Sequence, residues 1–366
     1  MSTSRKIWSL TWRLGVCGLL LFWIFHSIFT HEAQQLAGDR WEELDRREQW
    51  AAAWSQGPVQ LWNTLRLIHP VAFVASLGLM GCSLAFGIWR WRVIMKVQGI
   101  DLPLPRAAEI SLVAHFFNSF LLGSTGGDLM KAYYAARETH HKKTEAVVTV
   151  FADRLVGFWS MLFFASIMMA LNFSLVAGHD VLRTLAVVIL AMLFACSLLA
   201  GLAFWGGVTR GWSGARGWLR RLPKGAWLER LLDSCRQFGR APRFLFRAVC
   251  LSMALNAVCV LQVWVLAAGL NLDVPPRVWW FVVPAIISLS ALPITPSGLG
   301  VRENLFVLVL ASERLGVSET SALSLSLLAY AGSLFWSLVG GGVYLTLRNR
   351  RALREVARVE AVAENA

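Results

Sequence analysis

The sequence predicts an all-α polytopic membrane protein with about six full spans and two broken re-entrant helical hairpins. Of its 366 residues, 56% are apolar and only 16% are charged, whereas a soluble globular chain carries about 25% charged residues. A soluble fold could not hide this much apolar surface, because its exterior must remain wet. Apolar runs of about 20 residues, enough to cross a bilayer, also recur along the chain.

Six apolar runs are long enough to be full spans. The first follows Arg5 and Lys6 and lacks an A-x-A cleavage site, so we expect a retained span and not a removed signal peptide. The six predicted spans are Ile7–Phe29, Ile68–Trp91, Val147–Phe173, Val181–Trp205, Ala248–Leu270 and Ala322–Leu347.

Two further apolar stretches, Ala107–Leu122 and Val278–Leu292, are too short for ordinary spans. Each ends in a turn rich in Gly or Pro, Gly123–Gly127 and Pro293–Gly300, and then resumes as a second short helix. Such interruptions are typical of helices that enter the membrane and turn back within it.

The distribution of charge decides between hairpins and simple spans. Thr30–Leu65 has a net charge of −3 and Gly207–Arg247 a net charge of +8. Eight simple spans would place Gly207–Arg247 outside, against the positive-inside rule, whereas six spans and two hairpins place it in the cytoplasm. This topology also puts Trp89–Arg106 and both termini in the cytoplasm.

The two hairpins then enter from opposite sides, and their turns resemble each other at an offset of 171 residues. At this offset Leu121 falls on Leu292, Gly127 on Gly298 and Lys131 on Arg302. Opposed entry and this likeness predict an inverted-topology repeat. Chance likeness of two Gly-rich turns is the alternative. The predicted halves are residues 1–180 and 181–347, followed by a basic cytoplasmic tail, 348–366.

Two connecting segments carry many Trp residues among charges. Thr30–Leu65 contains Trp41, Trp50, Trp54 and Trp62 and predicts a helix on the outer membrane interface; a solvated helical loop is the alternative. Gly207–Arg247 suits an amphipathic cytoplasmic segment on anionic lipid, or it serves only to determine topology.

Ionisable residues inside membrane segments are costly and are candidates for function. They gather beside the two breaks: Asp128, Lys131, the Asp153-Arg154 pair and the Arg302-Glu303 pair, with His115 and Asn118 as polar neighbours. The cations favour a phosphate, and the carboxylates would balance them when the site is empty. The sequence leaves open whether Asp128 pairs with Lys131 or with Arg154.

The backbone at the breaks also favours an anion. Non-helical backbone at membrane depth must be satisfied by protein or by a water-filled cavity, and a helix that starts there directs its N-terminal amides into the site. Glycine-rich turns can cup an anion in the same way. The candidate substrate-binding residues are therefore Asn118, Gly126, Gly127, Asp128, Lys131, Arg154, Pro296, Gly298, Gly300, Arg302 and Glu303.

Each candidate also has a purely structural reading. Asp128 could cap its helix, and Arg154 could be the buried partner of an acid. Lys131 and Arg302 could extend their charges to the membrane surface. The convergence of these charges on two breaks favours the functional reading.

Signatures of soluble catalysis are absent from the sequence. It contains no G-x-S-x-G, H-E-x-x-H, Walker A or Rossmann fingerprint, and His140-His141 lacks the i, i+4 spacing of a helical metal site. The six Cys form no C-x-x-C pair. From these missing motifs we expect no metal and no cofactor. We also expect no nucleic-acid partner, because the positive-inside rule accounts for the net charge of +13.

Three segments resemble signatures of one family, and the resemblance covers nearly the whole chain. They are His115–Arg137 with Gly126-Gly127-Asp128 and Lys131, Asp153–Gly157, and Leu292–Glu303. The chain thus resembles the lysylphosphatidylglycerol synthase transmembrane region, also called the flippase-like family. The resemblance implies a single lipid-translocating domain over residues 1–366, in the bacterial cytoplasmic membrane, in which Asp128, Arg154 and Glu303 matter most.

The sequence departs from the family pattern at two positions and in one domain. Lys131 stands where the family often has Arg, and Pro296-Ser297-Gly298 replaces the usual Pro-Gly-Gly. The soluble aminoacyl-transferase domain of the synthase members has no counterpart in the nineteen residues 348–366. We therefore expect that this chain does not itself aminoacylate lipids.

Three functions remain open at this point. The chain could transport a lipid with an anionic headgroup or a lipid phosphate between leaflets, exposing a midplane site to each side in turn. It could instead be an enzyme of lipid-linked sugar or headgroup transfer. It could also be a scaffold for a lipid-biosynthesis enzyme. A homo-oligomer is compatible with each.

Overall fold

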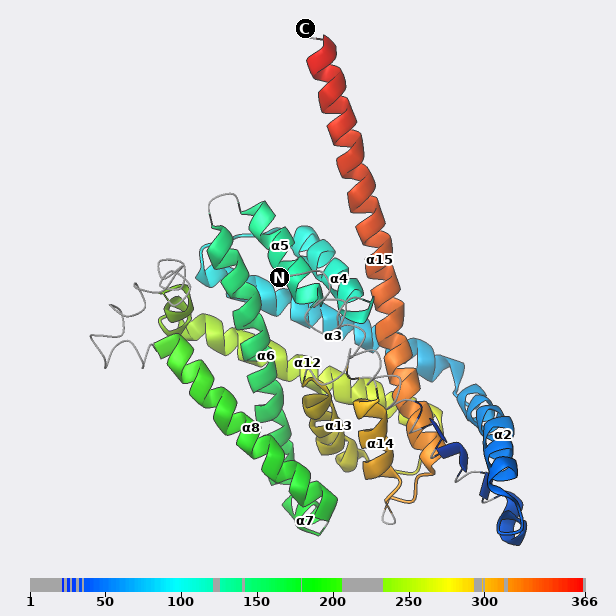
Figure 1. Ribbon diagram of the computed structural model, residues 1–366. Coiled ribbons are helices and arrows are strands. Elements are labelled where there is room, and N and C mark those ends of the chain that lie inside the picture. Colours follow the sequence, from blue (N-terminus) through cyan, green and yellow to red (C-terminus); the bar gives the residue numbers. More distant parts are fainter. Residues whose placement is uncertain are drawn as a thin grey trace.

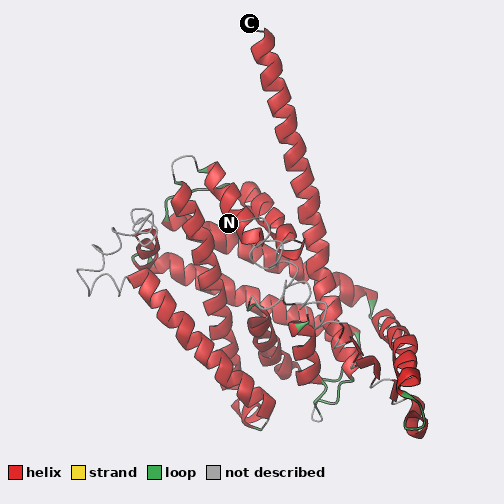
Figure 2. Ribbon diagram, in the orientation of Figure 1, coloured by secondary structure: helices red, strands yellow, loops and turns green. Residues whose placement is uncertain are grey.

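The computed structural model describes residues 36–120, 126–139, 142–178, 180–205, 233–292, 300–312 and 315–364, with residue 298 and scattered positions between 22 and 34. Within these residues every regular element is a helix (Figures 1 and 2). The predicted all-α fold class is confirmed. Figure 1 shows the helices as one bundle, from which the C-terminal part of α15 projects.

The elements follow the predicted order along the chain. A short 3-10 helix, η1 (Gly38–Trp41), comes before the α-helices. The α-helices are α2 Arg46–Arg66, α3 Pro70–Val97, α4 Leu104–Phe120, α5 Gly126–Glu138, α6 Lys143–Leu171, α7 Phe173–Ala177, α8 Asp180–Trp205, α12 Pro242–Gly269, α13 Pro276–Ser290, α14 Val301–Leu310 and α15 Glu319–Glu364.

Five helices of the described residues are long and apolar enough to cross a membrane, so the protein is a multi-pass membrane protein. They correspond to five of the six predicted spans, and their bounds are Pro70–Val97, Lys143–Leu171, Leu182–Phe204, Pro242–Gly269 and Glu319–Leu347. The sixth predicted span, Ile7–Phe29, lies mostly outside the described residues and stays a prediction.

Both short apolar stretches form a helix, a break and a second helix. The first hairpin comprises α4 and α5, and the second comprises α13 and α14. Residues 121–125 and 293–297 of the turns lie outside the described residues. In Figure 1 the two hairpins lie toward opposite ends of the bundle, α4 and α5 toward the end from which α15 projects and α13 and α14 toward the end where α7 lies.

The element order from α3 to α6 recurs from α12 to α15: a long helix, a broken hairpin and a second long helix. The two leading helices, α3 and α12, each have 28 residues and lie side by side. They run antiparallel, because the His69 N–H before α3 donates to the carbonyl of Gly269 at the end of α12 (3.0 Å).

Each hairpin packs on the last long helix of the other half. In the first hairpin α4 contacts α15, and in the second hairpin α13 contacts α6. The helices α3 to α6 and the helices α12 to α15 are therefore interlocked and not simply adjacent. The division into half-repeats 1–180 and 181–347 stays a prediction.

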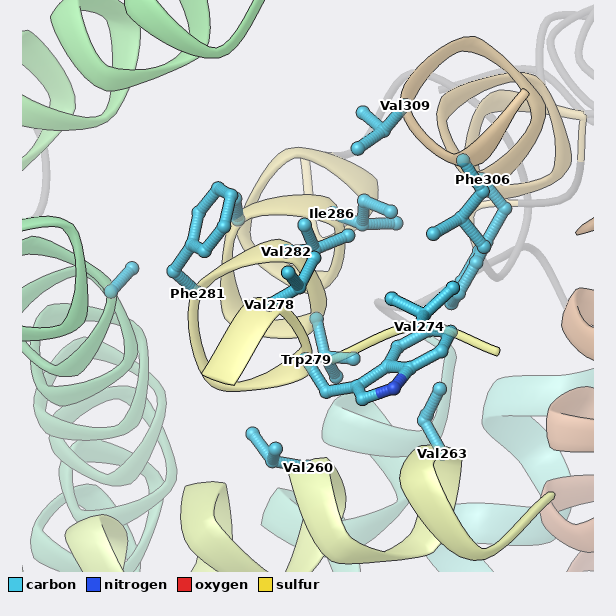
Figure 3. Packing of buried hydrophobic residues seen from close by; sticks show 14 of the residues in the cluster. Val260, Val263, Val274, Val278, Trp279, Phe281, Val282, Ile286, Phe306 and Val309 are labelled. Atoms are coloured by element: carbon cyan, nitrogen blue, oxygen red, sulfur yellow. The ribbon is translucent and has the colours of Figure 1, made fainter. Parts of the chain in front are cut away.

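The largest apolar core surrounds α13, which is buried along most of its length. Figure 3 shows Trp279, Val282 and Ile286 of this helix gathered with Val263 of α12 and Phe306 of α14. Because α13 is enclosed by other helices, the break that follows it can be satisfied by protein groups.

The segment predicted to lie on the outer interface contains a well-capped helix. The carboxylate of Asp45 and the side chain of Glu48 form a capping box at the start of α2. Trp50 and Trp62 of this helix are exposed, as expected for rings at a membrane surface. The other Trp-rich segment, Gly207–Arg247, is described only from residue 233, and α12 begins within it at Pro242.

Candidate functional site

A cavity of about 220 Å³ lies among α3, α4, α5, α6 and α12. Its wall is unusually polar for a membrane protein interior. The polar and charged residues that line it are Ser83, Arg90, Ser111, His115, Asn118, Asp128, Lys131, Asp153 and Arg154. Four of the predicted site residues, Asn118, Asp128, Lys131 and Arg154, are thus brought together around one space.

The inner end of this cavity is a three-residue ion cluster around Asp153. One carboxylate oxygen of Asp153 accepts from Arg90 Nε (2.8 Å), and the other accepts from Lys131 Nζ (3.0 Å). The exposed fractions of the Arg90, Lys131 and Asp153 side chains are only 12%, 11% and 6%. The buried cluster therefore ties α3, α5 and α6 together.

Two aromatic and polar contacts hold the inner cations in place. Lys131 Nζ lies 4.3 Å from the ring centroid of Trp91, a favourable cation–π contact. Arg90 Nη1 donates to the Ser252 hydroxyl on α12 (3.1 Å). Both cations thus have contacts besides Asp153.

The outer end of the cavity is a second ion pair. Asp128 Oδ1 lies 2.6 Å from Arg154 Nη2 and also accepts from Arg154 Nε (2.7 Å). Asp128 therefore pairs with Arg154 and not with Lys131. The Arg154 side chain is 54% exposed, against 23% for Asp128, so this pair marks the mouth of the cavity.

The first break is held by a close contact between α4 and α5. Asn118 Oδ1 accepts from the Gly127 N–H (2.9 Å), and Gly126 and Gly127 are both buried. A Cβ on Gly127 would lie 1.9 Å from the Ala114 carbonyl oxygen. The Gly127 amide is occupied by Asn118, so it is not available to cup an anion as the sequence suggested.

The second break contains a separate and more enclosed cluster. The fully buried Glu303 accepts from the Gly300 N–H (2.7 Å) and pairs with Arg302. Gly300 and Gly298 have φ values of 83° and 70°, which residues with a Cβ rarely adopt. Pro296, a further predicted site residue, lies outside the described residues.

Arg302 is bound on its other side by α15. Its Nε donates to the Ser326 hydroxyl (3.1 Å), and its guanidinium carbon lies 4.7 Å from the ring centroid of Tyr330. Neither Arg302 nor Glu303 lines the cavity of the first cluster. The second break therefore positions α14 against α15.

The helix α15 contacts both the wall of the first cavity and the second cluster. His115 Nε2, in the cavity wall, lies 3.1 Å from the Ser333 carbonyl oxygen, whereas Arg302 contacts Ser326. Seven residues of helix correspond to about 10 Å. The charges of the two breaks thus form two separate clusters and do not line one shared cavity, and α15 contacts the wall of the first cavity through Ser333 and the second cluster through Ser326.

The sequence analysis missed Arg90. It was assigned to the positive segment Trp89–Arg106, although it also falls within the predicted span Ile68–Trp91. The rule that intramembrane charges are functional candidates, applied within that span, would have found it. Among the described residues there is no group of three or more His, Cys, Asp or Glu arranged to hold a metal ion.

The fold and the site define a polytopic α-helical membrane protein with a charged cavity inside its bundle. The sequence model of the lysylphosphatidylglycerol synthase TM region matches residues 49–361. This is most of the chain, so the protein belongs to that family, as the resemblance predicted. A search of curated proteins finds no match.

Proposed function

We propose that the protein moves a lipid with an anionic headgroup between the leaflets of the bacterial cytoplasmic membrane, with both termini in the cytoplasm. The observation that carries this proposal is the cavity among the spans, lined by three cationic side chains and two carboxylates. Charges inside a membrane bundle are costly and mark substrate pathways. The excess of cations favours an anion.

The arrangement of helices supports movement across the membrane. Inverted repeats with broken helices are the framework on which many transporters alternate access to a central site. The recurring order of elements, the antiparallel α3 and α12 and the hairpins at opposite ends agree with such a framework. Rocking of one half against the other would expose the cavity to each leaflet in turn.

A scaffold subunit of a lipid-modifying enzyme is the second candidate. The enclosed cluster of Arg302, Glu303 and Ser326 favours it, because these contacts are satisfied within the protein. In that case the first cluster would also be structural. Substitutions in the first cluster would then lower the abundance of the protein, and the wild-type protein itself would not transport lipid.

Leaflet exchange in proteoliposomes tests the proposal. We expect the purified protein to speed exchange of a fluorescent anionic phospholipid, and Asp128→Asn and Arg154→Ala to abolish this rate at equal incorporation. Glu303→Gln tests whether the second cluster also takes part. Glu109→Gln is the matched control, because Glu109 pairs with Arg106 away from the cavity.

The opposite result would favour the scaffold. If folded wild-type protein gives no exchange above that of empty liposomes, across several headgroups and a polyprenyl phosphate, the transport proposal is wrong. If Arg154→Ala leaves the exchange rate unchanged, the protein transports lipid without using this cavity.

A further inference from the structure

We propose that Arg90 and Lys131 form an inner phosphate subsite that prefers a singly charged phosphodiester headgroup to a doubly charged phosphomonoester. This inference rests on the proposed function, since it takes a membrane lipid as the source of the phosphate. It adds Arg90 to the candidate site and gives Asp153 the role of an internal counter-ion.

The geometry of the inner cluster fits a phosphate. Arg90 and Lys131 converge on the two oxygens of one carboxylate, at 2.8 Å and 3.0 Å. Two neighbouring phosphate oxygens could be held by the same pair of cations. Arg90 directs one N–H to Asp153 and one to Ser252, and both cations have further N–H groups for a ligand.

A hydroxyl in the cavity wall supports a polar ligand at this depth. The oxygen of Ser111 is buried and has no hydrogen-bond partner among the described residues, and Ser111 lines the cavity. A buried hydroxyl without a partner is unfavourable. A bound headgroup oxygen would relieve this cost, whereas a purely structural ion cluster leaves it unexplained.

The number of charges sets the expected preference. Three cations, Arg90, Lys131 and Arg154, face two carboxylates, Asp128 and Asp153, which gives the lining a net charge of +1 with His115 neutral. The undescribed turn, residues 121–125, contains no charged residue. A phosphodiester would make the site neutral, but a doubly charged phosphomonoester would leave a buried excess negative charge, which is costly.

The mouth of the cavity favours a lipid over a soluble phosphate. Arg154 and Asp128 lie at this mouth, and Leu129 of α5 and Phe151 of α6, close to them in sequence, are exposed hydrophobic residues. In a membrane such side chains face hydrocarbon or the interface. A headgroup could therefore enter sideways between α5 and α6 while its chains stay in the bilayer.

Binding in detergent solution tests the subsite without requiring transport. The probes are phosphatidylglycerol, a phosphodiester, and phosphatidic acid, a phosphomonoester, with the same acyl chains, well above pH ~6, near which a phosphomonoester takes its second charge. We expect wild type to bind the diester more tightly. Arg90→Gln should weaken binding of this diester by roughly ten- to a hundredfold, the range of one charge-assisted hydrogen bond.

Asp153→Asn provides the sharper test, because it raises the charge of the lining to +2. We expect it to shift the preference toward the phosphomonoester by at least about tenfold. Asp128→Asn makes the same change at the mouth and replaces Asp153→Asn if that variant does not fold. Glu109→Gln, outside the cavity, should leave the preference unchanged.

Each arm has a result that overturns part of the inference. Unchanged affinity in folded Arg90→Gln removes the subsite, and an unchanged preference in both carboxylate variants removes selection by charge. Equal competition by the deacylated headgroup, glycerophosphoglycerol, would assign a soluble ligand instead of a lipid. If these binding preferences hold but proteoliposomes show no exchange, the subsite stands and the transport proposal fails.

Discussion

Gly157 of α6 makes room for the side chain that completes the inner ion cluster. A Cβ at this position would lie 2.7 Å from Arg90 Nη1 and 3.0 Å from its guanidinium carbon. The guanidinium group of Arg90 therefore packs directly against Gly157 where it binds Asp153. The glycine in the Asp153–Gly157 segment is explained by this packing and not by backbone conformation.

Gly157→Ala should destabilise the protein by about 1–3 kcal/mol, the usual cost of overpacking a filled site. Thermal unfolding in detergent measures this effect, with Gly201→Ala of α8 as the control, because a Cβ at Gly201 meets no atom within 4 Å. In an Arg90→Gln background the cost should become smaller, since the shorter side chain avoids the contact. Additive costs would show that Gly157 does not act through Arg90.

Glu303 is the most enclosed carboxylate among the candidate residues. It accepts from the Gly300 N–H that precedes α14 and pairs with the neighbouring Arg302. Glu303→Ala should cost about 3–5 kcal/mol, because it leaves the Arg302 guanidinium without its carboxylate. Glu303→Gln should cost less, since an amide oxygen can still accept from the Gly300 N–H.

Chemical denaturation compares these variants with the double substitution Arg302→Met/Glu303→Leu. We expect the double variant to recover part of the loss, because an apolar pair avoids the desolvation of two charges. Equal stability of Glu303→Ala and wild type would mean that this cluster does not hold α14 in place.

At the scale of the elements, the contact between α4 and α15 depends on two consecutive glycines. A Cβ on Gly340 would lie 2.1 Å from the Leu112 carbonyl oxygen, and one on Gly341 would lie 2.9 Å from the Phe116 ring. Gly342, one residue further, faces open space. Small residues let helix backbones approach closely in membranes, and here they seat the first hairpin on the last span.

Gly340→Ala and Gly342→Ala form a matched pair of variants on one helix. Gly340→Ala should separate α4 from α15 and lower the melting temperature in detergent, with a cost of roughly 1–3 kcal/mol. Gly342→Ala should be neutral or slightly stabilising, because Ala is the better helix former. Equal melting temperatures for the two variants would contradict the close contact at Gly340.

At the scale of the whole molecule, the arrangement agrees with the topology expected from charge. Figure 1 shows α2, α7, α13 and α14 toward one end of the bundle, and α4, α5 and the projecting part of α15 toward the other. The helices of the first group belong to segments predicted to lie on the outer side or to enter from it. Those of the second group belong to segments predicted to lie in the cytoplasm or to enter from it.

Cysteine accessibility in intact cells tests this orientation. In a background with all six Cys replaced, Gln56→Cys on α2 should react with a membrane-impermeant maleimide from outside. Arg240→Cys, exposed just before α12, should react only after the cells are opened, because the positive-inside rule places it in the cytoplasm. The reverse pattern would invert the orientation, and reaction of both in intact cells would contradict the topology.

The sequence by itself determined the positions of five spans and of the two breaks. Both depend on local composition, because about 20 apolar residues cross a bilayer and clusters of Gly and Pro interrupt helices. The same locality explains why Asp128, Lys131 and Arg154 could be singled out: a charge within or beside an apolar run is conspicuous wherever it pairs.

Only the tertiary structure decided which charges meet. Arg90 and Asp153 are 63 residues apart in the chain, and no local pattern relates them. The structure also paired Asp128 with Arg154 and kept Arg302 and Glu303 in a cluster of their own. The reason is physical. Apolar composition determines that a helix lies in the membrane, but packing sets its rotation and its neighbours. Here the close contacts at Gly127, Gly157 and Gly340 do so.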